Sequence, residues 1–280
     1  MKQVLSFDID QTLNVAKTPI TKEIAELLRD CLDHFEIAPI SGQKFDQFLI
    51  QIVNPLLKVG TTPAQLTHLH LFVAQGTQYY RYTGKVMKKG PLTLELGPNS
   101  TYDEKNWHQV YSHPLTDEQI TKITSALETA AKETGYWEAD KLPKNDEIIE
   151  NRHSQVTFSA LGQTAGTDEK YAWDPDTKKR QAIVARAKEL APEFEYEIGG
   201  TTSINAFTPG MNKVFGMTHL MEELGVAKDD ILYFGDMTQP GGNDYPVVEM
   251  GIDTITVRSH EDTAYCLRGI LGILDESDAE

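Results

Sequence analysis

The sequence predicts an α/β fold in which a parallel sheet, covered by helices on both faces, is interrupted by an inserted α+β segment. Three observations lead to this prediction. An apolar stretch near the N-terminus, residues 4–7, is followed at once by two closely spaced aspartates. Strand-like and helix-like patterns then alternate up to residue 74. The same alternation returns after residue 210, beyond a middle region with a different pattern.

The N-terminal region contains three predicted strands separated by two predicted helices. Residues 4–7 and 36–40 are the first two strands, and the second ends at Ser41 and Gly42. Apolar residues recur at helical spacing over 21–35 and again over 43–57, and residues 67–74 predict a third strand. Strands that alternate with helices in this way form parallel sheets with crossover connections.

The middle region combines hairpin, helix and strand patterns. Residues 78–96 resemble a hairpin, and a capping box at 116–119 begins a helix that ends near residue 135. Strand patterns over 148–161 and 202–207 flank a helix at 175–190, and after residue 210 come a helix (212–224) and two strands (231–234 and 254–257). We therefore expect one domain from residues 1–85 and 211–280, and an inserted domain from residues 86–210.

Composition narrows the class of protein. The chain has 280 residues and a net charge of -16, which argues against nucleic acid or an anionic membrane as a partner. It contains no uninterrupted run of about 18 apolar residues, and Asp8 and Asp10 interrupt the apolar stretch that a signal peptide would need. Two cysteines, Cys31 and Cys266, imply no disulfide framework. A cytoplasmic protein is the expectation.

Asp8 and Asp10 follow the first predicted strand. Residues i and i+2 of a strand point to the same face, so the two carboxylates would converge at the edge where open α/β sheets bind ligands. Like charges this close repel each other, and a hard cation such as Mg2+ relieves the repulsion. The pair suggests a nucleophile and a general acid or base that share a metal. An Asp-rich turn is the alternative when this motif is taken alone.

Two further residues lie where a turn follows a strand or where a helix begins. The Ser41 hydroxyl can hold a phosphate oxygen, assisted by backbone N–H groups of the next helix. Taken alone, Ser41 is more often a helix N-cap. Lys213, in the first turn of its predicted helix, can neutralise both a phosphoryl group and the aspartate that accepts it. A solvated surface lysine is the alternative for this residue.

A glycine-rich segment, residues 234–244, supplies the fourth element and again follows an apolar strand. Asp236 would complete a metal site, and Asp244 could orient Lys213 or the waters of the metal. A glycine-rich turn alone is usually only a turn. Four such elements in this order are hard to produce by chance.

Together these segments resemble the four motifs of the haloacid dehalogenase (HAD) superfamily, whose phosphotransferases form an aspartyl phosphate. Residues 235–244 are closely similar to the motif of eukaryotic-type phosphomannomutases, and residues 204–213 resemble the segment that joins cap and core in that family. The resemblance implies a Rossmann-like HAD core, residues 1–85 and 211–280. It also implies an α+β cap of type IIB, residues 86–210, that determines substrate specificity.

The resemblance further implies a mechanism. The Asp8 carboxylate would attack a phosphoryl group, and Asp10 would transfer protons to and from the sugar or water oxygen. Mg2+ would be held by Asp8, the backbone carbonyl of Asp10 and Asp236. Gln11 replaces a glycine that is usual in the family. The same motifs supply further substrate-binding and supporting positions: Thr12, Ser41, Gly42, Asn243 and Asp244.

The inserted segment bears on the choice between mutase and phosphatase. A mutase must hold a second phosphate in the cap, and the family does so with several arginines, whose guanidinium groups bind phosphate bidentately. Arg152 matches one of these arginines, whereas Gln163 and Lys170 stand where two others are usual. Ser203 matches a sugar-contacting residue, and Asn205 replaces an aspartate.

Because each lost bidentate contact costs about 1.5–3 kcal/mol, we expect a Mg2+-dependent phosphatase that acts on a sugar phosphate or a similar small ester. The alternative is a phosphomannomutase in which Lys170 and residues 178–180 rebuild the arginine clamp. A non-catalytic sugar-phosphate-binding protein is a third hypothesis, disfavoured because Asp8, Asp10 and Lys213 are all present. The resemblance also suggests a homodimer formed through the caps.

Two groups of residues are expected to be structural. His68 and His70 could pair on a metal, but surface or strand-edge positions fit them better. The basic residues 178–180 are expected at the solvated start of a helix.

Overall fold

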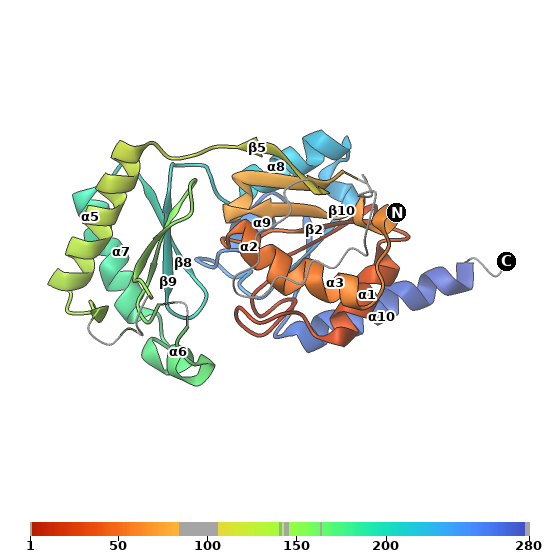
Figure 1. Ribbon diagram of the computed structural model, residues 1–280, viewed down its shortest axis with the longest axis horizontal. Helices are drawn as coiled ribbons and strands as arrows, with labels where there is room; N and C mark the ends of the chain where they lie inside the picture. The colour runs from red at the N-terminus through yellow and green to blue at the C-terminus, as the bar shows by residue number, and fades with distance from the viewer. Residues whose placement is uncertain (1, 84–105, 140–141, 143–145, 163, 278–280) are drawn as a thin grey trace. The chain divides into compact units, whose positions relative to one another are not determined.

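The computed structural model describes residues 2–83, 106–139, 142, 146–162 and 164–277, and it divides the chain into two compact units (Figure 1). The first unit consists of Met1–Tyr111 and Lys213–Glu280, and the second of Ser112–Asn212. The sequence had placed the first boundary at residue 86. Strand β5 (Trp107–Ser112) pairs with β4 (Gln78–Tyr82), which keeps β5 up to Tyr111 in the first unit. The predicted hairpin lies outside the described residues from residue 84 onward.

A parallel sheet forms the centre of the first unit, as the alternating strand and helix patterns predicted. Phe7 at the end of β1 lies opposite Phe234 on one side and Pro39 on the other, so the carboxyl ends of three strands meet at one edge. Isolated bridges place β3 beside β2, and β3 also begins the antiparallel pairing with β4. The strand order of the parallel sheet is β11 (Asp253–Thr256), β10 (Ile231–Gly235), β1 (Val4–Phe7), β2 (Glu36–Pro39), and β3 covers His70–Val73.

Alternate residues of β1 enter two hydrophobic cores, one on each face of the sheet. Leu5 and Phe7 lie in the larger core, and Val4 lies in the other. Ser6, fully buried on the second face, satisfies its hydroxyl by donating to the carbonyl of Ala38 at 2.8 Å. The larger core is covered by α1 (Lys22–Cys31), α2 (Phe45–Phe48), the π-helical turn Leu49–Val53, α3 (Asn54–Lys58), α4 (Pro63–Leu66) and α10 (His260–Ser277). The second core is covered by α8 (Lys213–Leu224) and α9 (Tyr245–Glu249).

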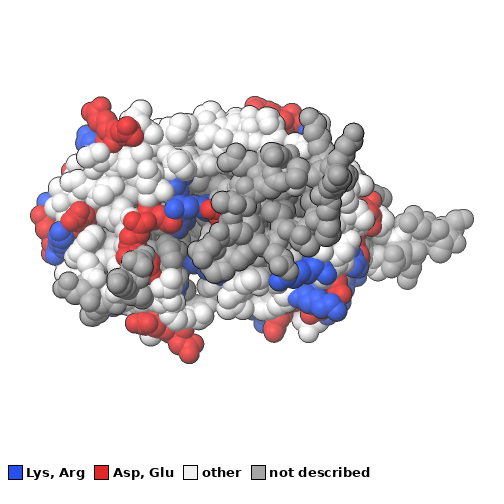
Figure 2. Space-filling view, in the orientation of Figure 1, with Lys and Arg blue, Asp and Glu red and all other residues white. Residues whose placement is uncertain are grey.

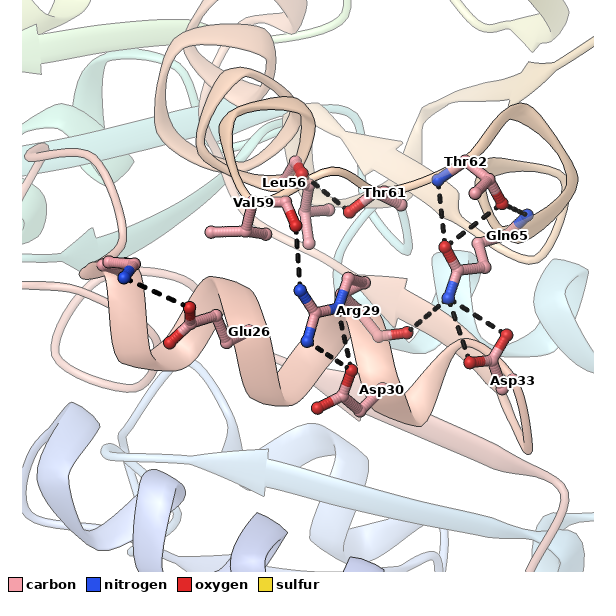
Figure 3. A network of polar contacts seen from close by, with 10 residues as sticks. Glu26, Arg29, Asp30, Asp33, Leu56, Val59, Thr61, Thr62 and Gln65 are labelled. Atoms are coloured by element: carbon pink, nitrogen blue, oxygen red, sulfur yellow. Dashed lines mark hydrogen bonds and ion pairs between the residues drawn. The ribbon is translucent and has the colours of Figure 1, made fainter.

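Polar contacts fix α1 to the chain that returns toward β3 (Figure 3). Arg29 donates to the carbonyl of Val59 at 2.8 Å and also pairs with Asp30. Gln65 closes a capping box with Thr62 at the start of α4, and its amide donates to the carbonyl of Arg29 at 3.2 Å. The segment before β3 is therefore held at both of its ends against the same helix.

His70 is buried, whereas the sequence predicted a surface or strand-edge position. It is fully buried on β3, where its ring nitrogens contact Tyr79 Oη at 2.7 Å and Glu36 Oε2 at 2.7 Å. His68 lies on the surface and contacts the other oxygen of Glu36 at 2.9 Å. A buried imidazole is stable here because both of its nitrogens have partners.

The second unit is an antiparallel sheet with helices on one face. Phe158 and Ile204 lie opposite each other on β7 and β9, and they pack with Leu127 of α5 and Ile183 of α7 in a separate core. The sheet order is β6 (Ile149–Asn151), β7 (Val156–Ser159), β9 (Ser203–Phe207), β8 (Glu195–Gly199), and the helices are α5 (Asp117–Glu133), α6 (Thr167–Trp173) and α7 (Lys178–Leu190).

Three further observations concern the charged side chains, the thiols and the lengths of the helices. On the face drawn in Figure 2, Asp and Glu side chains are interspersed with Lys and Arg rather than gathered into separate fields. Cys31 and Cys266 are both free thiols. Within the described ranges, no helix is long and apolar enough to cross a membrane.

Candidate active site

The predicted nucleophile lies at the carboxyl edge of the parallel sheet. Asp8 directly follows β1, and its backbone N–H donates to the carbonyl of Phe234 at 2.9 Å, which continues the pairing with β10 by one residue. Its side chain is nearly buried, with the residue 4% exposed. The position is the one at which open α/β sheets bind their ligands.

Lys213 connects Asp8 to Asp244. Its Nζ donates to Asp8 Oδ1 at 2.5 Å and to Asp244 Oδ1 at 2.5 Å, and the Oη atom of Tyr233 lies 3.1 Å away. The lysine is 1% exposed. Lys213 begins α8, so the helix delivers its first side chain into the site, and a surface position for this lysine is excluded.

The loop after β10 is closed around Asp244. The backbone N–H of Met237 donates to Asp244 Oδ2 at 2.9 Å, and the N–H of Asp244 donates to the carbonyl of Met237 at 3.1 Å. Gly235 has no space for a side chain, because a Cβ there would lie 2.6 Å from Asp244 Cγ and 2.9 Å from Tyr233 Cε1. Asp244 is therefore placed to orient Lys213, which is one of the two roles that the sequence suggested for Asp244.

Burial and mutual repulsion govern the charges of the site. Burial raises the pKa of Asp8 well above its usual value, and Asp244 and Asp236 raise it further, against the opposing effect of Lys213. Burial and the charge of Asp244 raise the pKa of Asp236 to about 7. For Lys213 burial alone would lower the pKa, but Asp244 and Asp8 outweigh it and raise the pKa, so the ammonium stays charged. One ammonium thus faces several carboxylates.

Asp10 belongs to a tight loop after Asp8. Its Oδ1 accepts a hydrogen bond from the backbone N–H of Lys17 at 2.7 Å. Gln11 has a φ of 65°, in the left-handed region that favours glycine. A glycine would adopt this conformation without strain, whereas Gln11 adopts it despite its side chain.

Ser41 and Gly42 lie in the loop after β2. Ser41 is nearly buried, its N–H donates to the carbonyl of Phe72 at 3.2 Å, and its carbonyl accepts from the N–H of Gln75 at 2.9 Å. The following helix α2 begins at Phe45 with Lys44 at the N-cap, so Ser41 is not a helix cap. Its backbone is instead anchored on the turn that follows β3.

Several buried polar atoms at this edge have no hydrogen-bond partner within the part of the chain that the structure describes. They include the Thr12 hydroxyl, the Asn243 Oδ1 atom and both side-chain polar atoms of Gln43. Unsatisfied buried polar groups cost about 1–3 kcal/mol each and call for an explanation. These three residues lie on the loops that follow β1, β10 and β2, so a polar ligand bound at this edge would explain all of them.

Gln43 and Tyr233 are the residues that the sequence reasoning missed. Gln43 was assigned only to a helix, although it follows Ser41 and Gly42 directly. Tyr233 was counted as an apolar strand residue, although a buried tyrosine usually needs a partner for its hydroxyl. That rule was the available signal for Tyr233.

The donor set fits Mg2+. Mg2+ in proteins is typically held by one or two carboxylates, together with waters and substrate phosphate oxygens. Asp8 and Asp236 are two carboxylates close enough for their charges to interact. Among the described residues no group of three or more His, Cys, Asp or Glu side chains is arranged to hold a metal ion. The excess of carboxylates over ammonium groups is the feature that a divalent cation would compensate.

In the second unit, the predicted substrate contacts lie on or near the sheet. Asn205 Oδ1 accepts from Thr157 Oγ1 at 2.9 Å, and the hydroxyls of Ser203 and Ser159 are 3.0 Å apart. Arg152 is 6% exposed and donates through Nε to Glu150 Oε2 at 2.7 Å.

Three other residues were candidates for binding a second phosphate: Gln163, Lys170 and Arg180. Lys170 is buried, and Gln163 lies outside the described residues. Arg180, expected at a solvated helix start, is buried, pairs with Asp174 at 2.8 Å and donates to the carbonyl of Gly200 at 2.6 Å. Arg180 is therefore engaged within its own unit.

Solved structures share this fold. The IMP-bound IMP-nucleotidase of Plasmodium falciparum aligns with 97% of this chain and 68% of its own chain, at a TM-score of 0.66 and 15% identity. A haloacid dehalogenase-like hydrolase from Bacteroides thetaiotaomicron aligns with 96% of this chain and 100% of its own, at a TM-score of 0.58 and 13% identity. The fold is that of the haloacid dehalogenases.

The family model that matches is that of the eukaryotic phosphomannomutases, over residues 105–273. With the buried Asp8–Lys213 pair, this makes the chain a HAD-type phosphoryl-transfer enzyme. Because the match covers well over half of the sequence, the chain belongs to the eukaryotic phosphomannomutase family.

Curated relatives match over nearly their full length. A probable phosphomannomutase of Caenorhabditis elegans is 24% identical over 283 residues, covering 98% of this chain and 97% of that protein. The phosphomannomutase of Saccharomyces cerevisiae is 24% identical over 277 residues, covering 95% and 93%.

Proposed function

We propose that the protein is a phosphomannomutase that interconverts hexose 1- and 6-phosphates through a phosphoryl group carried on Asp8. The observation that supports this most directly is the buried Lys213 between Asp8 and Asp244, in a chain whose relatives over nearly its full length are named phosphomannomutases. This proposal departs from the sequence-based preference for a phosphatase, because the comparisons favour the alternative.

In the proposed reaction, a carboxylate oxygen of Asp8 forms a bond to phosphorus while the bond from phosphorus to the leaving sugar oxygen breaks. Asp10 gives its proton to that oxygen. The oxygen of a sugar hydroxyl then forms a bond to the phosphorus of the aspartyl phosphate while the bond from phosphorus to Asp8 breaks, and Asp10 takes the proton of the hydroxyl. Lys213 offsets the negative charge that develops on the phosphoryl oxygens.

We propose Mg2+ as the cofactor, held by Asp8, Asp236 and the backbone carbonyl of Asp10. When bound, it would supply positive charge that keeps Asp8 ionised and lowers the energy of the transferring phosphoryl group. The raised pKa values of Asp8 and Asp236 support this assignment, because burial and neighbouring carboxylates disfavour their charged forms and a divalent cation would offset both effects.

A phosphatase is the second candidate, and the second unit supplies the observation in its favour. The two described arginines in question, Arg152 and Arg180, each form an ion pair with a carboxylate of their own unit. A second phosphate would have to compete with Glu150 or Asp174 for them. With a weakly held bisphosphate, water would replace the sugar hydroxyl as the attacking group, and the product would be free phosphate.

One experiment separates the two candidates. Purified protein with Mg2+ is incubated with mannose 1-phosphate or mannose 6-phosphate, with and without a catalytic amount of hexose 1,6-bisphosphate. Isomer formation that depends on the bisphosphate supports the mutase. Phosphate release without isomer supports the phosphatase. If the Asp8→Asn variant still forms isomer or free phosphate at the wild-type rate, both candidate functions are refuted.

Two further parts of the proposal concern assembly and location. The family resemblance suggests a homodimer through the inserted units, and the mass in solution from light scattering tests it. The free thiols of Cys31 and Cys266 support a cytoplasmic location, which cell fractionation would check.

A further inference from the structure

We propose that Tyr233 is a positioning residue for Lys213, and that its hydroxyl holds the third N–H of the lysine until a phosphoryl oxygen of the substrate takes its place. The inference rests on the proposed phosphoryl transfer to Asp8. It concerns a residue of the β10 strand, not one of the four motifs from which the site was first recognised.

Lys213 Nζ has three hydrogen-bond acceptors, one of which lies farther away than the other two. An ammonium group has three N–H donors, and three side-chain oxygens surround it. Asp8 and Asp244 each lie 2.5 Å from Nζ, whereas the Tyr233 oxygen lies 3.1 Å away. The first two partners are carboxylates, and the third is a hydroxyl. Hydrogen bonds between two charged groups are stronger than those with one neutral partner, so the contact with Tyr233 is the weakest of the three.

Tyr233 is itself held in one orientation. Its O–H donates to Asp244 Oδ1 at 2.5 Å, which leaves a lone pair of the tyrosine oxygen to accept from Lys213. The residue is fully buried, and its ring packs in the core beneath α8 and α9. Burial, with the adjacent charge of Asp244, raises the pKa of Tyr233 well above its usual value, so the hydroxyl stays neutral and remains a donor.

The Tyr233 hydroxyl provides an acceptor for the third N–H of Lys213 when no substrate is bound. A buried lysine with an unused N–H would carry an unsatisfied donor, which is costly. A third carboxylate there would satisfy the donor but would hold it too strongly to release. A neutral hydroxyl satisfies the donor and can be exchanged. When the P–O bond to Asp8 forms and the bond to the leaving oxygen breaks, the N–H on Tyr233 is the one that can turn to a phosphoryl oxygen, while Asp244 retains its own.

Tyr233→Phe removes the hydroxyl and keeps the ring. The matched control is Tyr79→Phe, which removes the hydroxyl of another fully buried tyrosine in the same core, bonded to His70 rather than to the site. A second test variant, Tyr233→Met, lacks the hydroxyl but packs differently. Turnover is measured with hexose phosphate and with p-nitrophenyl phosphate, and thermal unfolding confirms that each variant is folded.

We expect kcat of Tyr233→Phe and Tyr233→Met to fall about tenfold with KM within about twofold of the wild type, and the Tyr79→Phe variant to keep both values. Inhibition by vanadate, which mimics the five-coordinate phosphoryl group, should weaken by the same factor as kcat. Inhibition by inorganic phosphate should stay unchanged.

The proposal is overturned if kcat and vanadate inhibition are unaffected in Tyr233→Phe, if KM changes in place of kcat, or if Tyr79→Phe loses as much activity. A wild-type protein that hydrolyses p-nitrophenyl phosphate but does not isomerise hexose phosphates would refute the proposed mutase alone. The role of Tyr233 would still be decided by the p-nitrophenyl phosphate and vanadate results.

Discussion

Replacing Asp236 by asparagine is expected to stabilise the metal-free protein at neutral and alkaline pH while it abolishes stabilisation by Mg2+. The structure gives the reason. Asp236 has a pKa of about 7, raised from the ordinary 3.8 by burial and by Asp244. As the pH rises above 3.8 the unfolded chain ionises first, so this carboxyl group destabilises the fold progressively until the pH passes 7.

The size of the effect follows from the shift. About three pKa units at about 1.36 kcal/mol each give an upper value of about 4 kcal/mol. Part of this appears already at pH 5, so the stability of Asp236→Asn relative to the wild type should increase by about 2–3 kcal/mol between pH 5 and pH 8. Urea unfolding of the metal-free proteins at the two pH values measures the difference.

Mg2+ provides the second half of this test. At about 100 times its dissociation constant, a ligand that binds only the folded state adds about 2.7 kcal/mol of stability. The wild type should gain stability of this order with Mg2+, and Asp236→Asn should gain none. Asp46→Asn, which removes an exposed carboxylate from α2, is the control and should behave as the wild type. Equal Mg2+ stabilisation of wild type and Asp236→Asn, or an Asn variant that is less stable at pH 8, would refute the reasoning.

Three other substitutions test other parts of the structure. Gln43→Leu removes two buried polar atoms that have no partner among the described residues. The free protein should therefore gain about 1 kcal/mol in urea unfolding, while KM for the sugar phosphate rises. A lower stability with unchanged KM would contradict this. Burial alone would raise the pKa of Glu36, but hydrogen bonds from His70 and His68 lower it to about 2. The wild type should therefore lose about 1–2 kcal/mol of stability, allowing for partial exposure, as the pH falls from about 4.5 to 2. The Glu36→Gln variant should show no such loss. Gly216→Ala would place a Cβ 2.5 Å from Ile40 Cδ1 and 2.9 Å from Gly76 Cα, and we expect it to lower stability by about 1–3 kcal/mol, with an unchanged melting temperature as the contrary result.

The parallel core could be predicted because its signals are local. Apolar strands that end in aspartate or glycine, separated by helices of regular spacing, determine both the strand direction and the edge at which Asp8, Asp236 and Lys213 meet. Helix α10 escaped prediction because Tyr265 and Ile273 are 68% and 72% exposed, which obscures its apolar periodicity. Strand β8 was missed because Glu195 and Glu197 alternate with its apolar residues in too short a segment.

Contacts between distant residues could not be predicted from spacing. The burial of His70 depends on Glu36 and Tyr79, which come from two other strands. The burial of Arg180 depends on Asp174 and on backbone carbonyls of β8 and its following turn. In each case a polar residue looked exposed because its partner could be identified only in three dimensions.

The chain leaves the inserted unit at Asn212, and the next residue is Lys213. The C-terminal connection of the insertion thus passes directly into the residue that pairs with Asp8. Lys213 is clamped by Asp8, Asp244 and Tyr233, and Gly216 seats the first turn of α8 closely against Gly76. A chain anchored so firmly at its point of re-entry would tolerate a replaced or resized insertion while Lys213 stays in place. Exchange of the whole insertion would then leave Asp8, Lys213 and Asp244 in the same arrangement.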